Sequence, residues 1–386
     1  MIIHLVLSDD WELRGDGSGN MRAIQFDTLQ KITHIYENYG LRGSFNVELM
    51  QQFYHKKFGE RNPELLTLYN EWEEIVKNIY RKGHDVQLHL HPQWINAEYR
   101  DGKWILTSDW NINNHPPETI ERIVEQGKSY LENLLKPLNE NYSCISHRGG
   151  SWAVAPGDHL LKILSKHNIV FDMTIVDGLV SEFPVKIDYR NLEEPFLPYY
   201  PQMNDSRKVN NEKSPIITIP THSFLSRNIL LPLILQKLRS KKYLKPFIKR
   251  FDYYLSPRAL PIKDAGYNLE EYNHGRSEVK KRVEPKIHET LKTLFEKKLR
   301  ISDIAHLNYP LFKRMIKDIR TRAKKTGWEV VPVIIENHTK NIGNFDSIER
   351  FAKYISDADD ISVITHSDLA RNLQEDLYPI RMKRNV

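Results

Sequence analysis

The feature that most constrains the fold of this chain is a regular alternation of short apolar runs with longer segments of helical periodicity. Runs typical of buried strands lie near 2–8, 42–47, 85–90, 142–146 and 169–175, and helical segments lie near 21–39, 64–82, 116–136 and 156–167. The alternation returns at the end, with strands near 329–335 and 361–365 and helices near 308–325, 345–356 and from Asp368 onward. This pattern predicts a parallel sheet, either doubly wound or closed into a (β/α) barrel.

The middle of the chain breaks the alternation. Residues from about 182 to 300 are rich in proline, tyrosine and basic side chains and show no steady strand or helix period. A chain of 386 residues is long enough to bury the core of a large barrel. We therefore expect one barrel domain over 1–386, with an insertion or subdomain at about 182–300.

Composition and the N-terminal residues bear on the compartment. A hydrophobic fraction of 40% and a charged fraction of 27% are typical of a globular protein in water. The single cysteine, Cys144, excludes an intramolecular disulfide and fits a reducing compartment. The first apolar run ends after six residues, too soon for a signal peptide, and no stretch approaches the roughly 20 apolar residues that span a bilayer. We therefore expect a cytoplasmic protein.

The positive charge is concentrated in one segment. The net charge is +6, and seven Lys or Arg residues with no acid lie between Lys237 and Arg250, after an apolar run at 229–235. Such a segment is typical of a helix that lies on an anionic membrane surface, here the inner face. It is equally typical of a solvated insertion helix that keeps its Leu and Phe side chains on the core. The pattern leaves both interpretations of 229–250 open, with the solvated helix slightly favoured.

Ionisable and aromatic side chains gather directly after four of the predicted strands. In chain order they are Asp9, Asp10 and Trp11, then His89 and His91, then Arg148 and Trp152, and finally His338. In a (β/α) barrel the C-terminal ends of all strands open at one mouth. We therefore expect these side chains to lie near one another.

The spacing of two of these histidines has direct chemical content. His89 and His91 are two residues apart, so on an extended backbone both imidazoles point to the same face and can reach one ion. One added carboxylate completes a two-histidine, one-carboxylate set that suits zinc foremost, and also Co, Ni, Fe or Mn. Adjacent Asp9 and Asp10 repel each other unless a metal or an arginine compensates. Each pattern alone is also typical of packing, caps or turns, but their joint placement favours a metal site.

Several motifs are spread over both ends of the chain: Leu-Ser-Asp-Asp at 7–10 and the segments 39–47, 83–89, 148–152, 334–338 and 361–369. Together they resemble the polysaccharide deacetylase family, carbohydrate esterase family 4. The resemblance is greater to a branch associated with bacterial surface polysaccharide synthesis than to the secreted deacetylases. It implies a distorted (β/α) barrel that hydrolyses acetyl groups of an amino sugar or glycan, lipid-linked or not, with one divalent metal. It implies no nucleic-acid partner.

The resemblance also implies residue roles. Asp9 matches the catalytic base, and Asp10 matches the metal ligand that joins the two histidines. Arg148 matches the arginine that orients the base, and His338 matches the general acid. Trp11 and Trp152 are expected either to stack on a sugar ring as substrate-binding residues or to pack at the rim.

Some features depart from the family or favour other interpretations. The family spaces its metal histidines four apart, whereas here position 93 is Gln93 and the second histidine is His91. His222, which also follows a strand-like run, is a rival to His338 for the acid role. Another metallohydrolase acting on a non-sugar amide remains an alternative, as does a non-catalytic glycan- or membrane-binding relative. A non-haem iron oxygenase is disfavoured, because such enzymes sit on an antiparallel sheet.

Overall fold

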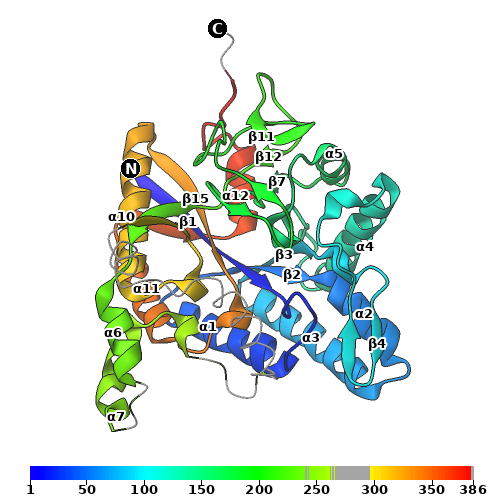
Figure 1. Cartoon of the computed structure of the whole chain (residues 1–386). Helices are drawn as coiled ribbons and strands as arrows, with labels where there is room; N and C mark the ends of the chain where they lie inside the picture. The colour runs from blue at the N-terminus through cyan, green and yellow to red at the C-terminus, as the bar shows by residue number, and fades with distance from the viewer. Residues whose placement is uncertain (240, 242, 261, 263–264, 266–295, 384–386) are drawn as a thin grey trace.

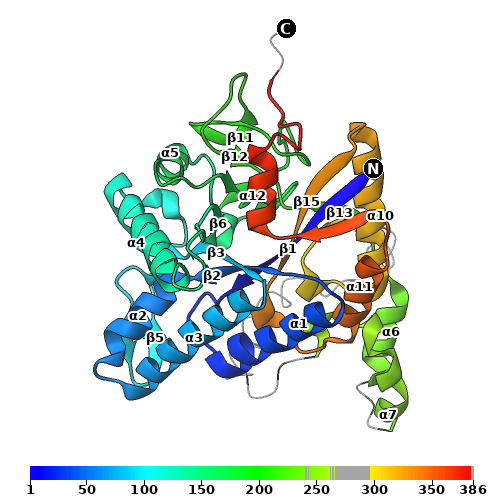
Figure 2. The ribbon, with the colours of Figure 1, turned by 180° about the vertical axis from the view of Figure 1, so that it is seen from behind.

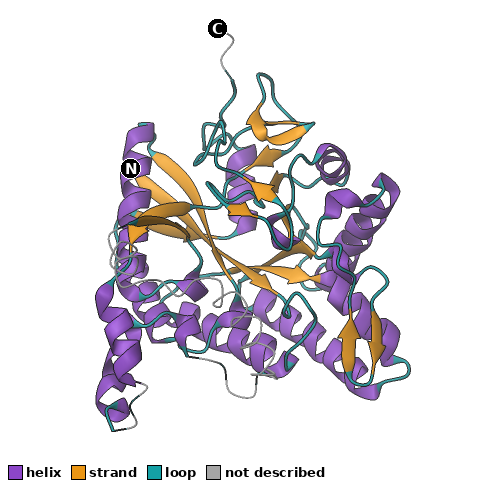
Figure 3. Cartoon of the chain, in the orientation of Figure 1, coloured by secondary structure: helices purple, strands orange, loops and turns teal. Residues whose placement is uncertain are grey.

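A curved parallel sheet forms the centre of the structure (Figures 1 and 3). The computed structural model describes residues 1–386 except 240, 242, 261, 263–264, 266–295 and 384–386. Its strands are β1 (Ile2–Trp11), β2 (Ser44–Glu48), β3 (Asp85–Leu90), β4 (Glu98–Arg100), β5 (Lys103–Ile105), β6 (Ser146–Gly149), β7 (Phe171–Asp172), β8 (Val180–Ser181), β9 (Ile187–Asp188), β10 (Pro201–Gln202), β11 (Asp205–Val209), β12 (Ile217–Thr218), β13 (Ser223–Arg227), β14 (Lys297–Ile301), β15 (Val330–Asn337) and β16 (Ile361–Ile364). Its helices are α1 (Asp27–Asn38), α2 (Leu49–Gly59), α3 (Pro63–Arg81), α4 (Pro117–Leu135), α5 (Asp158–Lys166), α6 (Leu230–Arg239), α7 (Lys245–Ile248), α10 (Tyr309–Thr326), α11 (Asp346–Ser356) and α12 (His366–Gln374).

Strand β1 pairs with three other strands of this sheet. The strand order is β12-β7-β6-β3-β2-β1-β15, and β16 also pairs with β1. One edge of β1 pairs with β15 from Ile2↔Val330 to Asp9↔Asn337. Along the other edge, β16 pairs with the first half of β1 and β2 pairs with the second half, all in parallel. The two ends of the chain therefore belong to the same sheet.

The sheet curls until its two ends nearly meet. Thr221, just beyond β12, forms a parallel bridge with Ile334 of β15, and the amide of His222 donates to the carbonyl of Ile334 at 2.9 Å. Helices surround the outer face of the curved sheet in both views (Figures 1 and 2). This arrangement confirms the predicted α/β fold with a distorted (β/α) barrel.

Apolar packing on the two faces of the sheet follows the strand period of two. Leu5, Leu7 and Trp11 of β1 belong to the large core between the sheet and its helices. Val6 of β1 and Ile334 of β15 belong to a smaller core inside the curve, where Phe171, Met173, Ile219, Leu369 and Leu373 join them. Leu369 and Leu373 come from α12, so this helix covers the concave side at one end.

Most predicted elements are present, with local differences. The fourth predicted strand, near 142–146, starts only at Ser146. Helix α2 was not predicted; it follows β2 directly, and Glu48 caps it by accepting from the backbone N–H groups of Met50 and Gln51. Residues 182–300 supply β12 to the central sheet as well as hairpins and the α6–α7 pair; the part at 266–295 lies outside the described residues. No described helix has the length and apolar character needed to cross a membrane.

Candidate metal centre and catalytic site

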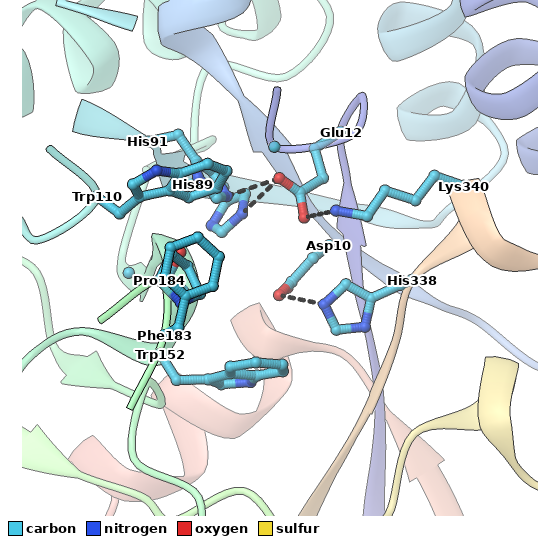
Figure 4. Close-up of a pocket in the computed structure, with 13 residues that line it drawn as sticks. Asp10, Glu12, His89, His91, Trp110, Trp152, Phe183, Pro184, His338 and Lys340 are labelled. Atoms are coloured by element: carbon cyan, nitrogen blue, oxygen red, sulfur yellow. Dashed lines mark hydrogen bonds and ion pairs between the residues drawn. The ribbon is translucent and has the colours of Figure 1, made fainter. Parts of the chain in front are cut away.

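A cavity of 290 Å³ lies where β1, β3, β6 and β15 end. Its walls combine carboxylates and imidazoles with aromatic side chains (Figure 4). The lining residues are Asp10, Glu12, Gly15, His89, His91, Trp110, Gly149, Ser151, Trp152, Phe183, Pro184, His338 and Lys340.

The alternation of β1 decides which acids reach the cavity. Asn46 of β2 donates from Nδ2 to Ser8 Oγ at 2.9 Å and to Asp10 Oδ1 at 3.0 Å, so Ser8 and Asp10 share the concave face. Glu12, two residues further, also lines the cavity. Asp9 lies between Ser8 and Asp10 in the sequence, so its side chain points to the opposite face of β1.

Glu12, His89 and His91 form a compact buried group. Oε2 of Glu12 lies 2.6 Å from Nε2 of His91 and 3.7 Å from Nε2 of His89. One ligand atom from each of the three residues lies within 4.8 Å of the others. Asp10, the carboxylate that the sequence motif implied as a ligand, does not belong to this group; the carboxylate beside the two histidines is that of Glu12. The physical reason is that β1 stays extended through Trp11, so the side chain of Glu12 points to the same face as that of Asp10 and lies one step further along the strand.

The other nitrogen of each imidazole is held by the protein. Nδ1 of His89 lies 2.8 Å from the carbonyl oxygen of Arg148, and Nδ1 of His91 lies 2.7 Å from Nε2 of Gln93. Both Nε2 atoms are buried, and apart from the carboxylate of Glu12 they have no polar partner among the described residues. Two buried nitrogens that converge on one carboxylate, with their rings oriented from behind, fit a divalent cation.

Gly150 allows the close approach of the His91 ring. A Cβ atom at this position would lie 2.7 Å from Nδ1 of His91. The two residues that follow, Ser151 and Trp152, both have positive φ, 53° and 54°. Non-glycine residues seldom adopt this conformation, and it clusters at functional sites. The turn therefore brings backbone against His91 while it directs Trp152 into the cavity.

The charge of Glu12 is stabilised in place. Burial opposes its ionised form, but His91 and Lys340 outweigh burial and hold the pKa of Glu12 well below its usual range. Nζ of Lys340 pairs with Oε1 of Glu12, which leaves Oε2 toward the imidazoles (Figure 4). Glu12 is thus an ionised, oriented carboxylate at neutral pH.

Asp10 is held as a second ionised carboxylate between two cations. Its Oδ1 lies 3.5 Å from Nε of Arg148, and its Oδ2 lies 3.7 Å from Nε2 of His338. Burial opposes ionisation, yet Arg148, His89 and His338 lower the pKa of Asp10. Arg148 is fully buried, and its Nε and Nη2 have no hydrogen-bond partner among the described residues. The arginine predicted to orient a base therefore faces Asp10.

His338 is oriented by a residue that the sequence did not indicate. Its Nδ1 lies 2.9 Å from Oδ2 of Asp303, which leaves Nε2 toward Asp10. Burial disfavours the charged ring, but Asp303, Glu336 and Asp10 outweigh it and raise the pKa of His338 to about 10. The ring therefore carries a proton on Nε2 at neutral pH, facing the cavity.

Asp303, Glu336 and His338 also lie close enough to share a cation. This second acidic group already has a cation of the protein beside it, because Nη1 of Arg148 lies 3.4 Å from Oε2 of Glu336. The same Oε2 accepts from Nε1 of Trp152 at 3.0 Å. With Arg148 and protonated His338 beside its two carboxylates, this group has its counter-charges from the protein, and the Glu12 group is the better metal candidate.

The expected roles of Asp9 and Trp11 disagree with their positions. Asp9 accepts from Nδ2 of Asn337 and from Oγ1 of Thr339 at 3.2 Å, and it does not line the cavity. Trp11 is 0% exposed and stacks on Trp72 of α3, at 5.4 Å between ring centres. Both point outward from β1 toward the helices, so neither contacts the cavity. The side chains that do reach the cavity are those of Asp10 and of other aromatic residues, Trp110, Trp152 and Phe183.

Most of the remaining predicted residues lie at the cavity, and one, His222, lies away from it. His89, His91, His338 and Trp152 line the cavity as expected, and Arg148 lies directly behind it. His222 is buried elsewhere, with Nδ1 at 2.7 Å from Ser302 Oγ and Nε2 at 3.3 Å from Asp318, and it is not a lining residue.

Sequence reasoning gave no site role to Glu12, Asp303 or Glu336. For two of these a signal was present, because Glu12 is two residues after Asp10 and Glu336 is two residues before His338. Asp303 lies in the segment without a repeating pattern, where no comparable signal exists.

The chain was compared with known proteins. No family model matches it, and no curated protein matches it. Among solved structures it is similar to a putative polysaccharide deacetylase from Mycobacterium smegmatis, with 11% identity and a TM-score of 0.46 over 100% of this chain and 94% of that one. It is also similar to the allantoinase PuuE, with 10% identity and a TM-score of 0.45 over 97% and 91% of the two chains. A probable polysaccharide deacetylase from Pseudomonas aeruginosa PAO1 shares 12% identity and a TM-score of 0.43 over 97% and 91%.

Proposed function

We propose that this chain is a metal-dependent hydrolase that removes an acetyl group from an amino sugar or glycan. One observation carries the proposal. Two buried imidazole nitrogens converge on the carboxylate of Glu12 in the same cavity in which Asp10, backed by Arg148, faces protonated His338. This is the set of groups that hydrolysis of an amide requires: a cation site, a base and an acid.

Glu12, His89 and His91 would hold the metal ion. Two imidazoles and one carboxylate are a donor set typical of zinc sites that keep open positions for chemistry. A zinc ion in such a set, when bound, lowers the pKa of water toward 7 and polarises a carbonyl. We propose zinc as the ion, with Co, Ni, Fe or Mn as the alternatives.

Asp10 is proposed as the general base. Arg148 and the neighbouring imidazoles keep its carboxylate ionised and oriented toward the cavity, where it can accept the proton of the attacking water. His338 is proposed as the general acid, because its Nε2 carries a proton at neutral pH and faces the same space. Its proton would go to the departing amine. Asp303 positions His338 and maintains its charge.

The remaining walls suit a sugar ring. Trp110, Trp152, Phe183 and Pro184 line the cavity on the side opposite Glu12 and Lys340 (Figure 4). Nε1 of Trp152 is held by Glu336, which fixes the indole plane next to His338, at 5.8 Å between ring centres. Apolar ring faces beside a few convergent polar groups are typical of sites that bind a polar ring with apolar faces.

Several finer points of this proposal rest on the sequence alone. They are a single barrel domain with an insertion at about 182–300, a cytoplasmic location, and a role in surface polysaccharide biosynthesis. The substrate is proposed to be an acetylated sugar, which is lipid-linked, nucleotide-linked or free.

An acetate-release assay tests the proposed function. Zinc-loaded protein is incubated with N-acetylated nucleotide sugars, lipid-linked N-acetylated oligosaccharides, O-acetylated glycans and acetylated non-sugar amines. We expect acetate from at least one sugar substrate and none after zinc is removed by a chelator. Turnover of the acetylated non-sugar amines alone would show that the substrate is another amide and not a sugar. Acetate release that is independent of metal would contradict the proposal.

A further inference from the structure

The α6–α7 pair carries an unusual surface. Six large apolar side chains along residues 230–250 are exposed to solvent, with fractions that run from 44% at Leu231 to 75% at Tyr243. The six are Leu230, Leu231, Leu233, Ile234, Tyr243 and Phe247. In both ribbon views α6 and α7 lie at the edge of the molecule, away from the central sheet (Figures 1 and 2). We call these six side chains the apolar face. A cluster of this kind exceeds the scattered exposed hydrophobics of an ordinary surface.

The apolar face is not needed for the packing of the helices themselves. Leu235, Ile248 and Leu255 form a separate small core under α6 and α7. Two hydrogen bonds join the segment after α7 to the barrel. Nδ2 of Asn344 donates to the carbonyl oxygen of Asp252 at 2.9 Å, and the backbone N–H of Gly343 donates to the carbonyl oxygen of Pro257 at 3.0 Å. The apolar face therefore lies on helices that have their own core and whose base is hydrogen-bonded to the barrel.

Basic side chains surround this apolar face. Lys241, Lys245 and Lys249 are exposed, and the sequence has no acid between 229 and 250. Among the residues that the structure describes, no carboxylate lies within ion-pairing distance of Lys241 or Lys245. Arg250 lies over the ring of Phe247, with Cζ 4.0 Å from its centre, so charge and apolar surface occur side by side.

We propose that the α6–α7 surface binds an anionic phospholipid bilayer. The exposed aliphatic and aromatic side chains would enter the boundary between headgroups and acyl chains, while the lysine stems extend along them and place their ammonium groups at the phosphates. Charge complementarity favours this occupant over a second copy of the chain, because a two-fold contact would bring the lysines of both copies together. This inference goes beyond the proposed hydrolase function and does not depend on it.

Vesicle sedimentation of the full chain tests the proposal. The vesicles are pure phosphatidylcholine or phosphatidylcholine with 30% phosphatidylglycerol. One variant carries Leu233→Ser, Ile234→Ser and Phe247→Ser, and a second carries Lys241→Glu, Lys245→Glu and Lys249→Glu. The matched control carries Lys162→Glu, Lys213→Glu and Lys103→Glu, three exposed lysines outside α6 and α7. All substituted side chains are exposed, and unfolding midpoints verify that each variant folds.

We expect the wild type and the control to sediment with the anionic vesicles and not with the neutral ones. Each basic residue near an anionic surface strengthens binding about fivefold, so the second variant should bind roughly 100-fold more weakly or lose binding. The serine variant should lose binding as well. Failure of the wild type to bind, or equal binding by all variants, would overturn the proposal. A further outcome would also overturn it. If sedimentation equilibrium without lipid showed that the wild type is a dimer and the serine variant a monomer, the apolar face would be an interface between two copies of the chain.

Discussion

Oε2 of Glu12 lies 2.6 Å from Nε2 of His91, although the two residues come from different strand ends. The contact is buried, and it exists because β1 keeps its extended conformation through Trp11 and so returns a second carboxylate to the concave face. It assigns the two inward acids of β1 to different partners. Glu12 faces the imidazoles of β3, and Asp10 faces Arg148 and His338.

Asp10→Asn should remove the base without removing the cation site. The amide cannot accept the proton of water, so kcat should fall by about 10²–10⁴-fold, while the zinc content stays near that of the wild type. Acetate-release kinetics together with metal analysis of the purified variant measure both quantities. A variant that keeps its activity, or that loses its zinc, would show that Asp10 has another role.

Asp9→Asn should change stability and spare turnover. Burial raises the pKa of Asp9 from 3.8 to about 7, against the hydrogen bond from Asn337. The folded state therefore binds this proton more tightly than the unfolded chain, and stability falls as the pH rises from about 4 to about 7. Asparagine removes this titration. Between pH 5 and pH 8 the wild type should therefore lose roughly 2–3 kcal/mol more of its free energy of unfolding than the variant loses.

Urea unfolding at the two pH values measures this difference. The amide can be accommodated because Oδ1 of Asn337 is buried without a partner, so rotation of that side chain provides an acceptor. An inactive but stably folded Asp9→Asn protein would restore the catalytic role that the sequence motif implied for Asp9.

Asp303→Asn should shift the pH profile of the reaction. Burial alone would lower the pKa of His338, and the carboxylate of Asp303 is the leading cause that raises it to about 10. A general acid works only while protonated, so the wild type should lose kcat/KM as the pH rises through about 10. In the variant this alkaline limb should move to lower pH, with activity partly recovered in more acidic buffer.

Asp318→Asn is the matched control for that experiment. Asp318 faces His222 at 3.3 Å in the same kind of pair but away from the cavity. It should leave the profile unchanged. If Asp318→Asn moved the limb and Asp303→Asn did not, His222 would take the acid role that we give to His338.

Gln93→Leu should weaken metal binding. The amide of Gln93 lies against Nδ1 of His91, and its Oε1 has no hydrogen-bond partner among the described residues. Nε2 of Gln93 also donates to the carbonyl oxygen of Gly15 at 3.2 Å. Reversal of the amide would exchange that bond for one in which Oε1 accepts the Nδ1 proton of His91, which leaves the lone pair of Nε2 for a cation. Loss of such a partner typically costs 10- to 100-fold in metal affinity. Titration against a zinc chelator measures this, with the exposed Gln126→Leu as the control; equal affinity in all three proteins would remove Gln93 from the site.

The sequence predicted the fold and part of the site for physical reasons that particular residues illustrate. The apolar runs are long enough to mark β1, β3 and β15, and the spacing of His89 and His91 places both imidazoles on one face. On β1 the motif was matched by adjacency, whereas the extended strand places neighbours such as Asp9 and Asp10 on opposite faces. The contribution of Asp303 depends on how the middle segment folds against β15, which no local pattern reports.

Zinc stoichiometry of the Glu12→Gln variant, measured beside Asp10→Asn, tests the central claim most directly. Each substitution removes one buried carboxylate charge from β1 and keeps the side-chain shape. The predicted result is a protein that folds as the wild type but has lost its bound zinc after Glu12→Gln, and one that has kept a single zinc ion after Asp10→Asn. The reverse pattern, with zinc retained by Glu12→Gln and lost from Asp10→Asn, would contradict the assignment of Glu12, His89 and His91 as the metal centre.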